Sequence, residues 1–422
     1  MKTRSTEKIH FIKNEKNYTN LIELWFPIES RDEDIALRAI LPRLLFYTSA
    51  KYPAEYLIER EYMRNYMLKT SSGVEQVGNQ LLYSFRLVIP QKRNIKDFNI
   101  EKAIQFFLDT IYHPCIDENG FVKFEEERNY LRKRMEHIRK SKIDSTIEEV
   151  FEILDEDGSL IASLYHHQDQ LESLKNQDVY HYYQKMVNTS RPFIFLYGNE
   201  ELLEASNLLE KFYKDFTPAQ IPFKKVNHFL TLHPSVKTVE KEKPYRESIL
   251  CMAYKVRDMK EEDRILLMML ANIIDSNVSR ILNDKLRNQE KLVYWATTSS
   301  YSKYGFLGIG CGIYKDNLQI TINKTEEMFK ELNDYETIAK ALALLKERDD
   351  CELLRILDHV YDEYDQYVTK YFGVEETNTE LMKRFQQITP DQVLAFLPRL
   401  KLDLIYFAKG GRRCRLILNL IN

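Results

Sequence analysis

Residues with catalytic or metal-binding side chains are spread along this chain at spacings that match few known sites. His166 and His167 are adjacent, so they cannot face one metal ion from the same side of a helix. His359 has helical spacing to Asp362 and Asp365, but the surrounding charged, tyrosine-rich run is typical of a solvated amphipathic helix. The helical zinc motifs H-x-x-E-H and H-E-x-x-H do not occur in the sequence. We therefore expect no metal site in this chain.

Cysteines and glycines offer two further possibilities, and both favour structural roles. The five cysteines are scattered without the closely spaced pairs that a zinc site needs, so we interpret them as reduced thiols. Gly308, Gly310 and Gly312 alternate with apolar residues inside a predicted strand, whereas a nucleotide-binding fingerprint lies at a strand-to-helix turn. Glycine on one strand face lets another group approach closely. Gly308 and Gly310 are therefore candidate substrate-binding positions, with tight packing as the alternative.

The overall composition is that of a globular protein with more than one core. The chain has 422 residues, of which 44% are hydrophobic and 30% charged, and its formal net charge is −3. Near-neutral charge disfavours nucleic acid as a partner. The polar stretch Met1–Asn20 does not resemble a secretion signal, and the longest apolar run, Ile265–Ile274, is too short to span a membrane. We expect a cytoplasmic protein without membrane partners.

The two halves of the chain repeat one pattern. A proline-rich stretch, 216–244, reads as a linker between them. The strand-like runs Leu21–Ile28 and Ile249–Val256 align at one offset of 228 residues. Each run precedes a predicted helix N-cap, Ser30 in the first half and Asp258 in the second, with a glutamate three residues later.

The order of the later elements also repeats. In each half, a second helix, a pair of strands, a long amphipathic helix and a late strand follow in turn. Strands separated by runs of helices predict an α+β fold in which helices cover a mixed sheet. We therefore expect two homologous domains, 1–215 and 245–422, each a mixed β-sheet covered by helices.

Three local stretches carry a resemblance to a known family. Thr48–Pro53 resembles the G-T-x-K-Y-P turn after that family's first helix, and Asp169–Leu174 with Val179–Tyr183 resembles the segment leading into a late helix. Arg287–Tyr294 resembles its R-x-x-x-x-L-x-Y element. Through these stretches the chain resembles the pitrilysin/insulinase-type (inverzincin) zinc peptidases, in particular half-size subunits similar to mitochondrial processing peptidase. The resemblance covers essentially the whole chain. The resemblance implies a clamshell of two homologous halves, and two such subunits around a peptide chamber.

The family's zinc site is degenerate in this chain. Catalytic members carry H-x-x-E-H on the first helix, where two histidines bind zinc and the glutamate acts as the base. Counting back from the matched turn places this window on residues 39–43. Ala39 cannot bind a metal, Pro42 cannot act as a base, and Arg43 places a cation where zinc would lie. Leu131–Met135, which matches the segment with the distal glutamate ligand, is also cationic.

The family's substrate-gripping pair is present. The resemblance implies that Arg287 and Tyr294 hold the peptide near the scissile bond, and in some two-subunit bacterial relatives one chain keeps the zinc motif while the other keeps this pair. We therefore expect the non-catalytic subunit of a heterodimeric zinc metallopeptidase, inactive alone. It would bind peptide and complete the active site of a homologous, H-x-x-E-H-bearing partner that holds the zinc. The structural alternative is a surface arginine beside a core tyrosine.

Two other functions remain open. A proteolytically inactive pseudopeptidase could act as a peptide-binding or assembly scaffold, and a homodimer could act as a peptide chaperone. Replacement of Arg287 or Tyr294 distinguishes the scaffold from a subunit that completes its partner's active site. It would reduce turnover only if the pair takes part in catalysis.

Overall fold

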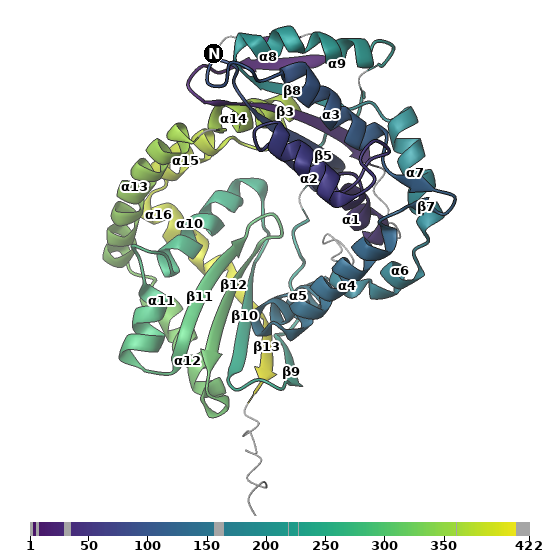
Figure 1. Ribbon diagram of the computed structural model, residues 1–422. Helices are drawn as coiled ribbons and strands as arrows, with labels where there is room; N and C mark the ends of the chain where they lie inside the picture. The colour runs from purple at the N-terminus through teal and green to yellow at the C-terminus, as the bar shows by residue number, and fades with distance from the viewer. Residues whose placement is uncertain are drawn as a thin grey trace, which may run out of the picture. The chain divides into compact units, whose positions relative to one another are not determined.

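The computed structural model describes residues 3–5, 8–28, 35–155, 164–217, 219–226, 228–359 and 361–410. The chain forms two compact units, each of which contains one large β-sheet with helices packed against it (Figure 1). Unit 1 comprises residues 1–138, 162–226 and 360–376, and unit 2 comprises residues 139–161, 227–359 and 377–422. Each unit therefore takes a segment from the other half of the sequence.

Unit 1 is built on a six-stranded sheet with the order β1-β2-β8-β3-β5-β4. Its strands are β1 (Thr3–Ser5), β2 (Ile9–Lys13), β3 (Thr19–Ile28), β4 (Lys69–Val77), β5 (Gln80–Pro90) and β8 (Phe193–Gly198). Neighbouring strands are antiparallel except β2 and β8, which are parallel. Its helices are α1 (Ile35–Leu44), α2 (Glu55–Arg64), α3 (Ile100–Tyr112), most of α4 (Phe124–Lys140), α6 (Gln168–Ser173), α7 (Asn176–Thr189), α8 (Glu200–Ala205), α9 (Asn207–Phe212) and α14 (Asp362–Phe372). A short hairpin, β6 (Ile116–Asp117) and β7 (Gly120–Phe121), completes it.

Unit 2 is built on a five-stranded sheet with the order β11-β12-β10-β13-β9. Its strands are β9 (Lys237–Glu242), β10 (Ser248–Val256), β11 (Val293–Tyr301), β12 (Phe306–Ile313) and β13 (Leu400–Lys409). Neighbouring strands are antiparallel except β13 and β9, which are parallel. Its helices are α5 (Lys142–Leu154), α10 (Arg264–Ile274), α11 (Ile281–Asn283), α12 (Leu318–Glu331), α13 (Tyr335–Asp358), α15 (Asn378–Gln387) and α16 (Pro390–Phe396).

The two sheets share one topology. Strands β4, β5, β3, β8 and β2 of unit 1 correspond in order and direction to β11, β12, β10, β13 and β9 of unit 2. The central strands also keep the offset seen in the sequence, since β3 ends at Ile28 and β10 ends at Val256. The predicted α+β fold with two helix-covered mixed sheets is confirmed.

Of the two predicted helix N-caps, one cannot be compared with the structure and the other is wrong. Ser30 lies outside the described residues. The prediction for Asp258 is wrong, because this residue has a left-handed φ of 51° and precedes the helical segment. Lys260 occupies the cap position, and its backbone N–H donates to the Asp263 carboxylate at 2.8 Å. The Asp263 carboxylate also binds the Arg399 guanidinium at 2.7 Å, so the helix begins at a buried ion pair.

Each central strand is buried on both faces, which explains its continuous apolar sequence. In β3, Leu24 and Phe26 pack against the main core of unit 1, whereas Trp25 packs against α14 through Phe372. In unit 2, one face of β10 meets α10 and its neighbours, and α5 covers part of the other face (Figure 1). Helices α14 and α5 are thus the segments that each half of the sequence contributes to the other unit.

A buried carboxylate attaches each of these helices to its sheet. On α5, Glu149 is 7% exposed and accepts a hydrogen bond of 2.7 Å from the Tyr406 hydroxyl of β13. It also forms ion pairs with Lys241 and Lys243. In unit 1 the carboxylate is on the sheet and the tyrosine is on the helix. The hydroxyl of Tyr364 on α14 donates a hydrogen bond to Glu23 of β3.

The pKa of Glu149 makes this attachment sensitive to pH. Burial by itself raises the pKa of the Glu149 carboxyl, but hydrogen bonds from the two lysines and the tyrosine outweigh it, so the pKa lies below its usual range. A carboxyl with a lowered folded-state pKa stabilises the fold fully above its unfolded-state pKa. That contribution is lost as the pH falls through the folded-state value.

We predict that Glu149→Gln lowers the stability of unit 2 by about 2 kcal/mol at neutral pH, because the ionised acceptor of three donors is lost. The difference from the unsubstituted protein should shrink as the pH falls below about 4. Urea unfolding gives the stability, and hydrogen exchange of α5 amides localises the loss. The exposed Glu152→Gln on the same helix is the control, and an equal effect of both substitutions would contradict the account.

Candidate functional site

The degenerate zinc window lies on α1, where Arg43 is held by neighbouring side chains. Its Nε donates to the Glu127 carboxylate of α4 at 2.6 Å. The guanidinium also lies 3.8 Å from the ring centroid of Tyr130 and bonds the Tyr47 hydroxyl at 3.3 Å. The carbonyl of Pro42 accepts a hydrogen bond from Ser72 of β4. Within this window the Arg43 cation is therefore paired with the Glu127 carboxylate and covered by the Tyr130 ring.

These residues do not fit a zinc ion. Ala39 and Pro42 have no side-chain ligand atoms. Arg43 is positively charged and already forms an ion pair with Glu127. In the cationic stretch of α4, Leu131 and Met135 are core residues, while Arg132 pairs with Glu172 at 2.6 Å. Within the described ranges, His, Cys, Asp and Glu side chains do not gather in a group of three that could hold a metal. No catalytic step through a metal follows from this arrangement.

Arg287 lies in an irregular helical segment of unit 2. Residues Asp284–Gln289 form a π-helix directly after α11, a backbone form that frequently occurs at functional sites. Leu286 anchors this segment in the core, whereas Arg287 is exposed. Among the residues that the structure describes, none forms a hydrogen bond or an ion pair with the Arg287 guanidinium. Its five N–H donors are thus available to a ligand.

Tyr294 lies seven residues further on, in a bulge of the edge strand β11. The register of β11 against β12 shifts between Val293 and Trp295, so Tyr294 is the extra residue. Lys291, just before the strand, has a left-handed φ of 55°. Bulges redirect side chains and are common beside active sites. The result is a tyrosine side chain that is 41% exposed at the start of β11.

The Tyr294 hydroxyl is protonated at neutral pH, as the ordinary tyrosine pKa of about 10 already ensures, and its surroundings favour this form further. Its ring lies 4.8 Å from that of Tyr314, between centroids. Partial desolvation, then the hydrogen bond with Tyr314 and the nearby Glu247 carboxylate, raise the pKa of Tyr294 to about 12. The phenol is therefore a hydrogen-bond donor at neutral pH, as stabilisation of a developing oxyanion requires.

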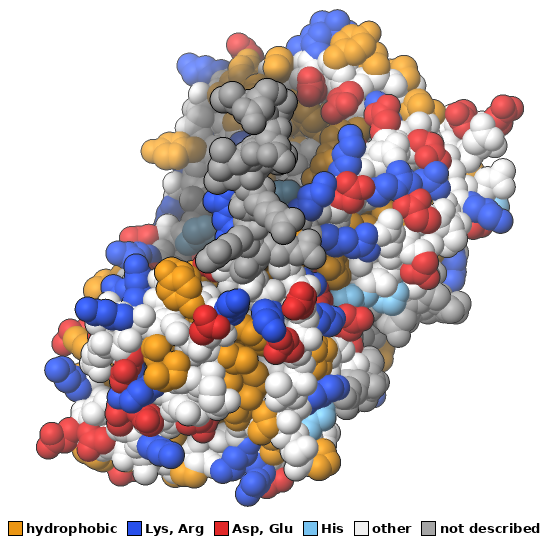
Figure 2. Space-filling view, turned by 90° about the horizontal axis from the view of Figure 1, so that it is seen from below, with side chains coloured by type: hydrophobic (Ala, Val, Ile, Leu, Met, Phe, Trp, Pro, Cys, Tyr) orange, Lys and Arg blue, Asp and Glu red, His pale blue; other side chains and the backbone are white. Residues whose placement is uncertain are grey.

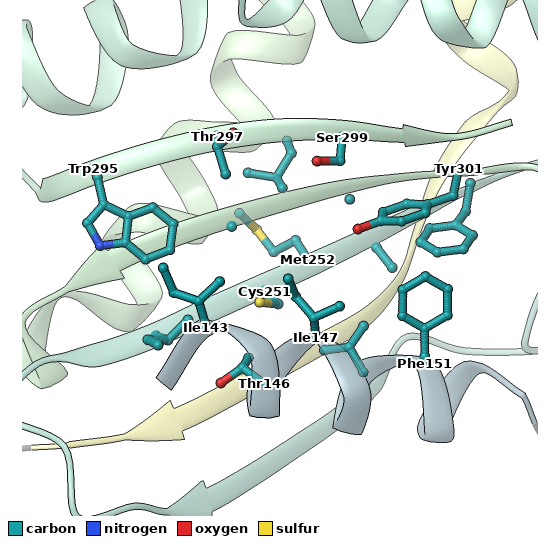
Figure 3. Close-up of a pocket in the computed structure, with 17 residues that line it drawn as sticks. Ile143, Thr146, Ile147, Phe151, Cys251, Met252, Trp295, Thr297, Ser299 and Tyr301 are labelled. Carbon is teal, nitrogen blue, oxygen red and sulfur yellow. The ribbon is translucent and has the colours of Figure 1, made fainter. Parts of the chain in front are cut away.

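Gly308 and Gly310 lie on β12 and line an apolar pocket. The pocket, of about 90 Å³, lies between α5 and the sheet of unit 2 (Figure 3). An added Cβ at Gly308 would lie 3.1 Å from the Tyr301 ring, and one at Gly312 would lie 2.3 Å from Trp295 Nε1. These two glycines give room to aromatic rings, whereas a Cβ at Gly310 would meet its neighbours at 3.5 Å or more.

The wall of this pocket on α5 was missed by the sequence reasoning. Ile143 and Ile147 come from the first half of the chain, and they are 51% and 38% exposed. Their spacing of four residues on one helix face was the available signal. This apolar pair could not be placed against β12, the strand with the glycines, because nothing in the sequence says which sheet α5 covers.

Surface charge is mixed on the face shown in Figure 2, where Lys and Arg side chains are interspersed with Asp and Glu. Of the helices in the described part of the chain, none is long and apolar enough to cross a bilayer.

Residues 173–344 match the family model described as the peptidase M16 inactive domain. With the relatives below, this match confirms the resemblance to the pitrilysin-type peptidases that was predicted from the sequence.

The chain is similar to particular bacterial proteins over nearly its whole length. The relative named "Probable inactive metalloprotease YmfF", from Bacillus subtilis (strain 168), is 18% identical over 409 residues, which cover 95% of each chain. A conserved protein from Enterococcus faecalis V583 has a TM-score of 0.79 at 20% identity, over 96% of this chain and 97% of its own. A protease from Helicobacter pylori has a TM-score of 0.72 at 13% identity, over 97% and 99%. At these identities the structures establish the fold.

We predict that Arg43→Met destabilises unit 1 by about 2 kcal/mol, because Glu127 is then buried without its cation. Adding Glu127→Gln should recover at least half of the loss, since the unpaired charge is removed. Urea unfolding of the four members of this double-mutant cycle measures the coupling. Arg132→Met on the exposed pair of α4 is the control and should change little. Additive effects of the Arg43 and Glu127 changes would contradict this account.

Proposed function

We propose that this chain is the non-catalytic subunit of a heterodimeric zinc metallopeptidase, working in the bacterial cytoplasm on short or unfolded peptides. A homologous partner with an H-x-x-E-H motif holds the zinc and the general base. This chain grips the peptide and completes the partner's active site. The observation that carries the proposal is the exposure of Arg287 and Tyr294 on three consecutive backbone irregularities.

The cost of those irregularities supports a functional role for the pair. A π-helix, a left-handed non-glycine residue and a bulge each depart from the most stable backbone, and they follow one another between residues 284 and 294. The fold of unit 2 does not use the Arg287 side chain, since its guanidinium forms no hydrogen bond or ion pair within the described structure. Backbone strain beside exposed polar side chains is typical of ligand-binding positions.

The two side chains suit the chemistry of peptide-bond cleavage. The Arg287 guanidinium can donate two parallel hydrogen bonds to a peptide carbonyl or carboxylate. The Tyr294 hydroxyl, which is protonated at neutral pH, can donate to the oxyanion that forms when water attacks the scissile carbonyl. Neither group supplies the nucleophile, which in this proposal is water on the partner's zinc.

The non-catalytic role draws support from the relatives. The matching family model is described as an inactive domain, and the Bacillus subtilis relative is named as a probable inactive metalloprotease. The zinc window of this chain holds the Arg43–Glu127 ion pair instead of ligands. An inactive chain with an intact gripping pair has a use in proteolysis only beside a zinc-bearing subunit, which is why we propose the heterodimer.

We predict that Arg287→Ala and Tyr294→Phe each reduce turnover of the reconstituted pair, while its assembly is unchanged. Loss of one oxyanion donor costs about a hundredfold in kcat, so Tyr294→Phe should act mainly on kcat. Arg287→Ala should reduce kcat/KM by about tenfold or more through weaker peptide binding. A quenched-peptide assay measures turnover for this chain mixed with its zinc-bearing paralogue.

Two exposed residues of the same unit are matched controls. Arg280→Ala and Tyr335→Phe remove the same groups away from the bulge and should leave turnover unchanged. Full turnover in the Arg287 and Tyr294 variants would contradict catalysis by the pair and favour the scaffold function. A homodimer by mass measurement, with peptide binding but no turnover in any mixture, would favour the chaperone.

A further inference from the structure

The apolar pocket of unit 2 lies along the strand that carries Tyr294. Its walls are the row Trp295, Thr297, Ser299 and Tyr301 on β11, the glycines of β12, and the α5 side chains. Figure 3 shows Trp295 and Tyr301 at its two ends, with Ile143 and Ile147 of α5 directed into the space between them. Both isoleucines remain partly exposed, so this apolar surface is open to solvent.

One end of the pocket is close to Tyr294. The lining residue Trp295 directly follows Tyr294 on β11. The negative charge of the Glu247 carboxylate contributes to the raised pKa of the Tyr294 hydroxyl. Glu247 also forms an ion pair of 3.2 Å with Lys142, the first residue of α5, which precedes the pocket residue Ile143. A peptide held at Tyr294 would thus reach the Trp295 end of the pocket within a few residues.

The edge of β11 is not free at its centre, which directs a peptide toward the sheet face. The Asn283 side chain donates to the carbonyl of Ala296 at 2.9 Å, and the Asp275 carboxylate accepts from the backbone N–H of Thr298. A peptide cannot extend the sheet where these groups are already bonded. The face beside this edge carries the exposed hydroxyl residues Thr297 and Ser299, which form the rim of the pocket.

The size and chemistry of the pocket define its occupant. A dry apolar cavity of roughly 150 Å³ accepts benzene, so a volume of about 90 Å³ suits a branched aliphatic side chain. None of the described residues that line the pocket is charged. Thr146, a lining residue that is 1% exposed, has a buried hydroxyl without a hydrogen-bond partner among the described groups.

We propose that this pocket is a specificity site for a leucine, isoleucine or valine side chain of the peptide substrate, a few residues from the bond that is cut. The assignment of the ligand as substrate rests on the function proposed above. Gly310 is the position that makes room for the side chain, because Gly308 and Gly312 already accommodate the Tyr301 and Trp295 rings.

Peptide binding to this chain alone tests the pocket without any need for turnover. The ligands are two capped pentapeptides, with leucine or aspartate at the centre and alanine elsewhere. Methyl resonances of Ile143 and Ile147 report on binding in protein labelled at isoleucine methyl groups. We expect the leucine peptide to bind about tenfold or more tightly than the aspartate peptide, with shifts at both isoleucines.

Gly310→Ala is the decisive variant, because its methyl group takes up part of the pocket of about 90 Å³ without a steric clash in the fold. It should reduce the leucine preference severalfold, because a leucine side chain no longer fits the remaining space. Gly73→Ala on β4 is the matched control, since a Cβ there also meets its nearest neighbours at 3.4 Å or more. In the reconstituted pair, Gly310→Ala should raise KM for leucine-containing substrates and leave kcat unchanged.

Other outcomes separate this inference from the proposed function. Equal binding of both peptides, or an unchanged preference in Gly310→Ala, would overturn the pocket even if Arg287→Ala abolishes turnover. A leucine preference that falls severalfold in Gly310→Ala, with no turnover in any mixture, would support the pocket and contradict the split active site. Loss of association with the paralogue in Gly310→Ala would show that a partner chain fills the pocket, and it would overturn the inference.

Discussion

The buried carboxylate of Glu149 holds α5 against the sheet of unit 2, and the candidate site depends on it. Without α5, the β10–β12 face that carries the glycines would be an open sheet surface, and the apolar pocket would lose its second wall. The hydrogen bond from Tyr406 and the ion pairs with Lys241 and Lys243 fix the helix from two strands at once. Unit 1 uses the same device in reverse, with Tyr364 of α14 donating to Glu23 of β3. Each half of the sequence thus depends on the other to cover its sheet.

The two units differ in what surrounds the residues that the family resemblance singles out. In unit 1, the 39–43 window, which aligns with the family's zinc motif, holds Arg43 in an ion pair with Glu127 and provides no zinc ligands. In unit 2, the connection to β11 keeps costly backbone forms that expose Arg287 and Tyr294. This contrast is the basis of the proposed role.

Much of this could be predicted from the sequence, and the limits have physical causes. The duplicated sheet followed from the offset of 228 residues, because strand and helix periodicities depend only on neighbouring residues. The packing of α5 and α14 onto sheets from the other half is a long-range contact that periodicity does not encode. Asp258 was wrongly predicted as a cap, because a cap depends on backbone dihedrals and this residue is left-handed. The bulge at Tyr294 could not be predicted either, because it depends on the pairing register of β11 against β12.

The central claim is that this chain contributes side chains but no metal to a shared active site. Zinc quantified by mass spectrometry in the purified chain, in its H-x-x-E-H-bearing paralogue and in their complex tests it most directly. We predict about one zinc ion per heterodimer, held by the paralogue, and essentially none in this chain alone. A stoichiometric zinc ion in this chain alone would contradict the account, because no residue of the 39–43 window provides a ligand.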